Sequence, residues 1–266
     1  MKCEGDKTYS QPGKCPVCSM TLKKLTAAKY MVEVRPTQVI RAGETAALVI
    51  TIKDPGGKPV TKLETVHEKI VHLLVVSKDL SWFTHEHPQM QGDGTLRVAF
   101  AFPVPGEYML YHDFTPPGVG QQVVRVAVTV PGEAPSPLLL AVDSDKEKHV
   151  DGYAIVFSTK ASLRVGEDAE LVFQITKDGK PVTDLQPYLG AMGHLVIISE
   201  DLEHFVHSHP LDAVGATGPE VRFHAHFEAA GLYKAWGQFQ RGGKLLTVPV
   251  VLKVEDDGSH ESGGAR

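Results

Sequence analysis

The chain has 266 residues, of which 42% are hydrophobic and 22% are charged, and its formal net charge is −5. Domains cluster near roughly 100–150 residues, so this length predicts two hydrophobic cores rather than one. The weakly negative, mixed charge excludes the basic surface of a nucleic-acid-binding protein, and no apolar run approaches the roughly 18 residues that span a bilayer. The N-terminus also lacks the apolar core of a signal peptide.

Residues 1–26 are predicted to form a short metal-binding segment. All three cysteines of the chain lie there, at Cys3, Cys15 and Cys18. An odd, clustered set is a poor disulfide framework, whereas C-x-x-C is a metal or redox spacing. Two thiolates at that spacing can chelate one soft or borderline ion, with Cys3 and Met20 as candidate additional ligands. The alternative is a degenerate remnant that binds no metal tightly.

The segment YSQPGKCPVCSMTLKKL at residues 9–25 resembles the heavy-metal-binding domain of copper- and silver-efflux membrane-fusion proteins and of some metal-transporting P-type ATPases. It retains the P-G-K-C-P-x-C-x-M-x-L half of that motif. Residues 2–6 lack the preceding C-P-M-H-P half, and Ser19 replaces a glycine. The resemblance covers under a tenth of the chain. It implies metal ions as ligands and a metal-efflux or metal-delivery protein as a partner.

An internal repeat organises the rest of the chain. GKPVTKL at residues 57–63 returns as GKPVTDL at 179–185, and HLLVVSKDLSWFTHEHP at 72–88 returns as HLVIISEDLEHFVHSHP at 194–210. The offset between the copies stays between 122 and 125 residues, so they share order and length. We therefore predict two duplicated domains.

Each copy consists of short runs rich in Val, Ile, Leu, Phe and Tyr, separated by Gly, Pro and Asp clusters. This pattern, without long helical periodicity, predicts an all-β protein with two tandem immunoglobulin-like β-sandwich domains. The predicted strands of the first copy are residues 30–36, 46–53, 71–77, 82–87, 95–102, 107–113 and 122–130. The predicted boundaries are a first domain at 27–131, a linker at 132–138, a second domain at 139–255 and a disordered tail at 256–266.

Histidines are concentrated in the repeated hairpin. If KDLS at residues 78–81 is the hairpin loop, His72 lies directly opposite His87, and His85 shares their face because side chains alternate along a strand. Opposed Cβ atoms are about 4.5–5.5 Å apart, so the three imidazoles can converge on one ion. The second copy predicts the same cluster with loop EDLE and residues His194, His207 and His209. A loop of odd length would separate the histidines onto two faces.

The second copy carries two further histidines, His224 and His226, in the sequence FHAHF. If their side of the strand is also the side of the hairpin histidines, this copy presents up to five imidazoles. Met192 would then lie nearby and extend the site toward Cu(I). His67 and His112 are the corresponding additions in the first copy. The alternative is that the histidines of H-x-H-P are structural and donate to carbonyls at the rim of each sandwich.

The donor set constrains the metal and the chemistry. Neither sandwich contains a cysteine, which excludes a blue-copper centre, and all-imidazole ligation suits Cu(II) or Zn(II). No nucleophile elbow, phosphate loop or dinucleotide fingerprint is present. We therefore expect a protein that is not an enzyme and that sequesters or transfers metal ions, copper first and zinc as the alternative.

The repeats also resemble a family of bacterial exported β-sandwich proteins with the pattern H-L-x-V-x-S-x-D-L-x-x-F-x-H-x-H-P followed by P-G-x-Y-x-x-x-x-x-F. Together they span about four fifths of the chain. The resemblance implies copper handling in a periplasmic or extracellular setting and supplies no reaction. Two other functions stay open: a tandem immunoglobulin-like interaction module with structural histidines, and a three-histidine zinc or copper enzyme.

Overall fold

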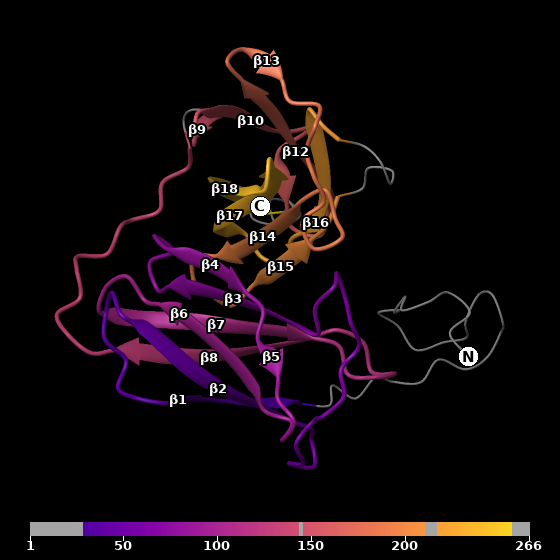
Figure 1. Cartoon of the computed structure of the whole chain (residues 1–266). Helices are drawn as coiled ribbons and strands as arrows, with labels where there is room; N and C mark the ends of the chain where they lie inside the picture. The colour runs from indigo at the N-terminus through magenta and orange to yellow at the C-terminus, as the bar shows by residue number, and fades with distance from the viewer. Residues whose placement is uncertain (1–28, 144–145, 211–216, 257–266) are drawn as a thin grey trace, which may run out of the picture. The chain divides into compact units, whose positions relative to one another are not determined.

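The computed structural model of the protein describes residues 29–143, 146–210 and 217–256. Every secondary-structure element in these ranges is a β-strand, which confirms the all-β fold class (Figure 1). The chain divides into two compact units. The first runs through Val75 and from Thr84 to Ala134, and the second comprises Val76–Phe83 and the chain from Pro135 onward. Within the described ranges there is no helix long and apolar enough to cross a membrane.

The first repeat of the sequence folds as a sandwich of two four-stranded sheets. Its strands are β1 (Met31–Pro36), β2 (Thr45–Lys53), β3 (Val71–Ser77), β4 (Phe83–Glu86), β5 (Gln89–Met90), β6 (Leu96–Ala101), β7 (Gly106–Phe114) and β8 (Gln122–Val130). One sheet has the order β1-β2-β6-β5 and the other the order β4-β3-β7-β8. The seven predicted strands are found to within one residue at each end, and the two-residue strand β5 is an addition.

The second unit repeats this plan with two five-stranded sheets. Its strands are β9 (Glu147–Val150), β10 (Tyr153–Thr159), β11 (Leu163–Arg164), β12 (Asp168–Lys177), β13 (Lys180–Pro181), β14 (His194–Ser199), β15 (Phe205–Ser208), β16 (Glu220–His226), β17 (Gly231–Arg241) and β18 (Lys244–Glu255). One sheet has the order β13-β12-β10-β9, with β16 also paired to β12. The other has the order β11-β18-β17-β14-β15. The two units are thus tandem immunoglobulin-like sandwiches.

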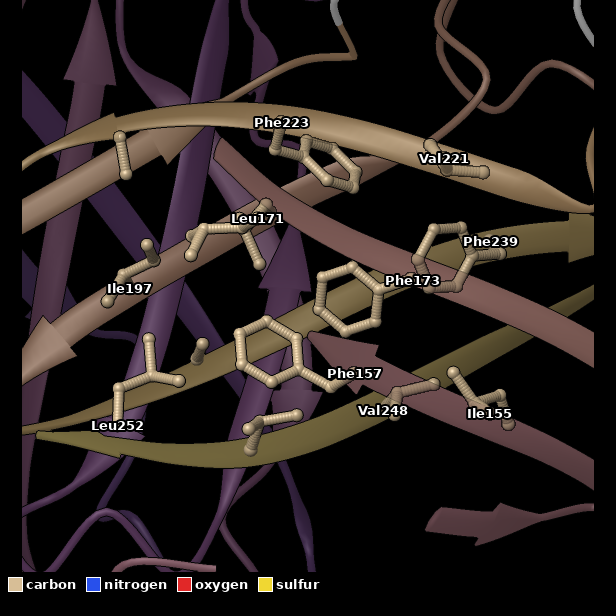
Figure 2. Packing of buried hydrophobic residues seen from close by; sticks show 14 of the residues in the cluster. Ile155, Phe157, Leu171, Phe173, Ile197, Val221, Phe223, Phe239, Val248 and Leu252 are labelled. Atoms are coloured by element: carbon tan, nitrogen blue, oxygen red, sulfur yellow. The ribbon is translucent and has the colours of Figure 1, made fainter. Parts of the chain in front are cut away.

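The core of the second unit lies between its two sheets and is centred on Phe173 (Figure 2). The rings of Phe157, Phe223 and Phe239 surround Phe173, with centroid distances of 5.1, 5.8 and 5.3 Å. Tilted and edge-on aromatic contacts of this kind add to the free energy gained by burial. Gly237 makes room for them, because a Cβ atom there would lie 3.0 Å from the ring of Phe173.

A tight turn sets the register of the β14–β15 hairpin. The ladder pairs Val196 with His207 and Ile198 with Phe205, and it closes with a hydrogen bond from Ser199 N to His204 O of 3.0 Å. Inside the loop, Asp201 Oδ1 accepts a 2.9 Å hydrogen bond from the backbone N–H of Glu203. A carboxylate that satisfies a loop N–H in this way favours the turn over other local structures. The even loop length is therefore as predicted.

The first repeat builds the same turn between β3 and β4. Ser77 N donates to Trp82 O at 3.1 Å, and Asp79 Oδ1 accepts from the N–H of Ser81 at 3.0 Å. The leucine after each aspartate has a positive φ, 57° at Leu80 and 65° in the second unit. The Asp-Leu pair thus fixes a four-residue loop in both copies.

A buried tyrosine supports the same corner of each unit. Tyr108 Oη donates to the carbonyl of Val104 at 2.7 Å, and Tyr233 Oη donates to the carbonyl of Ala229 at 2.8 Å. Each acceptor lies four residues before its tyrosine, the arrangement known as a tyrosine corner in immunoglobulin-like sandwiches. The identical bond shows that Tyr108 and Tyr233 are equivalent positions of the repeat.

Candidate metal centres

Three imidazoles meet on the β3–β4 hairpin of the first unit. The ring centroids of His72 and His85 are 5.3 Å apart, those of His72 and His87 are 5.2 Å apart, and those of His85 and His87 are 4.6 Å apart. One nitrogen from each ring lies within 4.8 Å of the others. Nitrogens bound to one metal at 2.0–2.1 Å can be at most about 4 Å apart, so small ring rotations would close the site. We call these residues the first triad.

The second unit repeats the arrangement at His194, His207 and His209, the second triad. Its centroid distances are 5.6 Å for His194–His207, 4.8 Å for His194–His209 and 4.7 Å for His207–His209. Again one nitrogen from each ring lies within 4.8 Å of the others. The structure thus brings together both sets of hairpin histidines that the register predicted.

The second triad lies on the side of its sheet that faces away from the sandwich core. In β14, Leu195 and Ile197 belong to the core cluster, and His194 is on the alternate side. Strand side chains alternate, so His207 shares the side of Val196, its partner in the ladder. His72, His85 and His194 are buried, with exposed fractions of 3%, 8% and 0%. The sequence alone did not decide between the two sides.

A backbone carbonyl fixes the tautomer of the first histidine in each triad. Nε2 of His72 lies 3.0 Å from the carbonyl oxygen of Val66, and Nε2 of His194 lies 2.8 Å from that of Tyr188. A carbonyl only accepts, so Nε2 carries the proton and Nδ1 presents a lone pair to the other imidazoles. Metal-bound histidines are oriented by outer partners of this kind.

The carbonyl of Val66 is presented by a two-residue turn over His67 and Glu68. Val66 N donates to Lys69 O at 2.8 Å and Lys69 N donates back at 3.1 Å, while the two central residues have φ of 47° and 64°. A turn with positive φ at both central positions is the type I′ geometry, which Asn and Gly adopt more readily than His or Glu. His67 therefore occupies a turn position and is not a member of the first triad.

The second unit has the corresponding turn over Leu189 and Gly190. Tyr188 N donates to Ala191 O at 2.8 Å, Ala191 N donates back at 3.2 Å, and the central residues have φ of 51° and 73°. The sequences VHEK and YLGA share no residue. Sequence comparison of the copies therefore missed these carbonyl partners, which only the shared backbone conformation reveals.

Comparison with family models identifies the repeats. The model described as Domain of unknown function (DUF8832) matches residues 25–132 and again residues 148–256. The chain belongs to the DUF8832 family. A second model, described as Heavy metal binding domain, matches residues 1–25. This bears out the predicted architecture of a metal-binding segment followed by two repeats. No curated protein matches the chain.

Among solved structures, the chain is similar to a two-domain fibronectin type III segment of chicken tenascin, with 10% identity, a TM-score of 0.24, and coverage of 83% of this chain and 97% of that one. It is similar to a marsupial T cell receptor, with 8% identity, a TM-score of 0.26, and coverage of 86% and 98%. For α-2-macroglobulin of E. coli the identity is 12%, the TM-score 0.28 and the coverage 86% and 14%. The chain therefore spans about one seventh of that α-2-macroglobulin.

Two predicted metal ligands of the second DUF8832 repeat, His224 and His226, lie outside the second triad. His224 and His226 are on β16, whose Phe223 and Ala225 face the core from the other sheet. His224 and His226 point outward from that sheet, toward Asp168: His226 Nδ1 is 3.1 Å and His224 Nε2 is 3.7 Å from Asp168 Oδ1. The expectation of five imidazoles on one surface is therefore wrong, because the two groups belong to opposite sheets.

Met192 and His112 also lie outside the triads. Met192 is partly buried and packs against the core cluster of the second DUF8832 repeat. His112, in the first repeat, is fully buried, and its Nδ1 lies 3.0 Å from the carbonyl oxygen of Val124. Burial lowers the pKa of His112 to about 4, so the ring is neutral. His112 is thus a core histidine. Cys3, Cys15, Cys18 and Met20 lie outside the residues that the structure describes.

Proposed function

We propose that the protein binds metal ions at the two histidine triads and sequesters them or passes them on, with copper as the principal ion and zinc as the alternative. The observation that carries this proposal is the repeated geometry of the triads. In both copies three ring nitrogens converge within 4.8 Å, and a loop carbonyl orients the first imidazole. The match of residues 1–25 to a heavy-metal-binding domain supports the same function.

The geometry favours ligation over a structural role for the histidines. A structural imidazole needs a hydrogen-bond partner for its N–H, and His72 already has one in the carbonyl of Val66. Its second nitrogen nevertheless faces another imidazole, at 3.0 Å from Nε2 of His85. Two ring nitrogens this close can bind one Cu or Zn ion once the proton between them has moved to another nitrogen, because imidazole suits both metals.

Three protein ligands would leave one coordination position of a tetrahedral ion open. An open position allows another donor to bind before the ion leaves, which suits transfer between proteins. In this proposal Cys15 and Cys18 take up soft metal and the triads hold it, and a metal-efflux or metal-delivery protein receives it. We propose no enzymatic activity.

Metal analysis of the full-length chain tests the proposal. Copper(I), copper(II) and zinc would be measured after equilibrium dialysis in a Cys3→Ser/Cys15→Ser/Cys18→Ser background, which removes all three thiols of the chain. We expect a variant with alanine at His72, His85 and His87 to lose about one equivalent, and a variant with alanine at His194, His207 and His209 to lose another. The control removes two histidines outside both triads, His224→Ala/His226→Ala, and should lose none. Equal binding by all variants would show that the hairpin histidines are structural.

We further propose that the protein works in the periplasm or outside the cell, on the basis of its resemblance to exported proteins. Fractionation of the cells that naturally produce it is the test. The proposal predicts recovery with the periplasmic or secreted fraction, and recovery with the cytosol would contradict it.

A further inference from the structure

The two triads differ in the residue that faces their first histidine across the sheet. In the second repeat, β14 and β17 pair His194 directly with Gln238. The equivalent of Gln238 in the first repeat is Asp113, because each lies five residues after the tyrosine that forms the tyrosine corner. The sheet order around the first triad is also the same, with β3 beside β7 as β14 is beside β17. One position thus carries a carboxylate in one repeat and an amide in the other.

Both residues are buried and held in place. Asp113 is 6% exposed, and its two carboxylate oxygens each lie 2.9 Å from Nε2 of Gln121. Gln238 is 3% exposed and donates from Nε2 to Thr247 Oγ1 at 3.3 Å. Gln121 orients the Asp113 carboxylate by donating to both of its oxygens. The two repeats therefore differ by one acidic group at a buried position.

This position is close to the triad but outside it. Directly paired residues project to the same side of a sheet with Cβ atoms about 4.5–5.5 Å apart. Asp113 is nevertheless not one of the groups whose ligand atoms lie within 4.8 Å of one another. It can therefore act on a bound ion through charge rather than as a ligand. Charges that are buried are screened by salt much less than exposed ones.

We propose that the two triads select different ions: the first triad, beside Asp113, takes a divalent cation such as Zn²⁺ or Cu²⁺, and the second triad, beside Gln238, takes monovalent Cu(I). This proposal rests on the proposed function. Three imidazoles are neutral, so the ion sets the charge of each centre. Coulomb attraction grows with that charge, and a neighbouring carboxylate stabilises a divalent ion about twice as much as a monovalent one.

The test is a pair of isosteric exchanges, Asp113→Asn and Gln238→Glu. Each is made in a chain that keeps only the neighbouring triad and in which serine replaces all three cysteines, Cys3, Cys15 and Cys18. Competition with chromophoric chelators gives the affinity for Zn²⁺ and, under reducing conditions, for Cu(I). We expect Asp113→Asn to weaken Zn²⁺ binding at the first triad roughly tenfold and Cu(I) binding roughly threefold. Gln238→Glu should strengthen Zn²⁺ binding at the second triad roughly tenfold and Cu(I) binding there roughly threefold.

The outcomes separate this proposal from the proposed function. If the single-triad chains bind neither ion, the proposed function itself fails. If they bind both, but the exchanges change the ratio of Zn²⁺ to Cu(I) affinity at neither triad, only the division of ions between the triads is overturned. Asp168→Asn is the matched control, because it removes an exposed carboxylate of the opposite sheet and should leave both affinities unchanged. Gln238→Glu gives an independent answer if Asp113→Asn does not fold.

Discussion

Nδ1 of His72 lies 3.0 Å from Nε2 of His85, between the two strands of one hairpin. Because the other nitrogen of His72 donates to the Val66 carbonyl, a hydrogen bond between the two rings requires His85 to supply the proton. The second repeat has the same relationship at 3.4 Å between His194 and His207. A metal ion that binds both nitrogens of either pair must displace that proton, which can move to the other nitrogen of the donating ring. Binding should weaken as the pH falls, because imidazoles bind a metal only in their neutral form.

The pH dependence of stability should reveal the buried His112. Its pKa is about 4 in the folded protein, below the roughly 6.5 of an unfolded histidine. The unfolded chain therefore binds a proton that the folded chain does not. Above about pH 6.5 His112 is neutral in both the folded and the unfolded chain, so it does not change the free energy of unfolding. As the pH falls toward 4, the unfolded chain takes up the proton, and this lowers the free energy of unfolding by up to about 3 kcal/mol.

Urea unfolding of metal-free protein between pH 7.5 and 4.5 measures this effect. His112→Leu should flatten the fall in the free energy of unfolding of the first unit, while the exposed control His224→Gln should keep the wild-type slope. An unchanged slope in His112→Leu would mean that His112 does not cause the effect.

The turn that carries the Val66 carbonyl should be stabilised by residues that accept positive φ. His67→Asn with Glu68→Gly replaces two strained residues by the pair that type I′ turns prefer, and should raise the free energy of unfolding by about 1 kcal/mol. Gly190→Ala is the opposite change in the second repeat, where φ is 73°, and should lower it by a similar amount. Chemical denaturation of both variants and of the wild type gives the sign of each change in the free energy of unfolding. Destabilisation by the Asn-Gly pair would contradict the assigned turn.

Each tyrosine corner should contribute about equally to its own unit. Tyr108→Phe and Tyr233→Phe remove a buried O–H donor and leave the carbonyl of Val104 or Ala229 without it. The expected cost is about 1 kcal/mol for each. Thermal unfolding followed by calorimetry would measure it, and a loss well below that figure at either site would show that the carbonyl finds another donor.

The strands and the triads could be predicted from the sequence because their signals are local. The Asp-Leu loop has an even length, and that length alone puts His194 opposite His209 and His207 on the same side. The other ligand candidates could not be settled in this way. The alternation in FHAHF correctly separates Phe223 and Ala225 from His224 and His226, but it says nothing about which sheet the strand joins.

The partners of the triads depend on the tertiary structure and have no signature along the chain. The Val66 and Tyr188 carbonyls belong to turns of unrelated sequence, so only the fold brings them to the histidines. The contrast between Asp113 and Gln238 can be read from the sequence only when the repeats are aligned at Tyr108 and Tyr233. The effect that we propose for this contrast on a bound ion follows only from the strand pairing, which puts Gln238 beside His194.

Anomalous diffraction from a crystal of the full-length protein soaked in copper or zinc tests the central claim most directly. The account predicts one peak within about 2.0–2.1 Å of a ring nitrogen of His72, His85 and His87, and a second at the same distance from His194, His207 and His209. Peaks only at other positions, with both triads keeping their mutual hydrogen bonds in the presence of the metal, would contradict it.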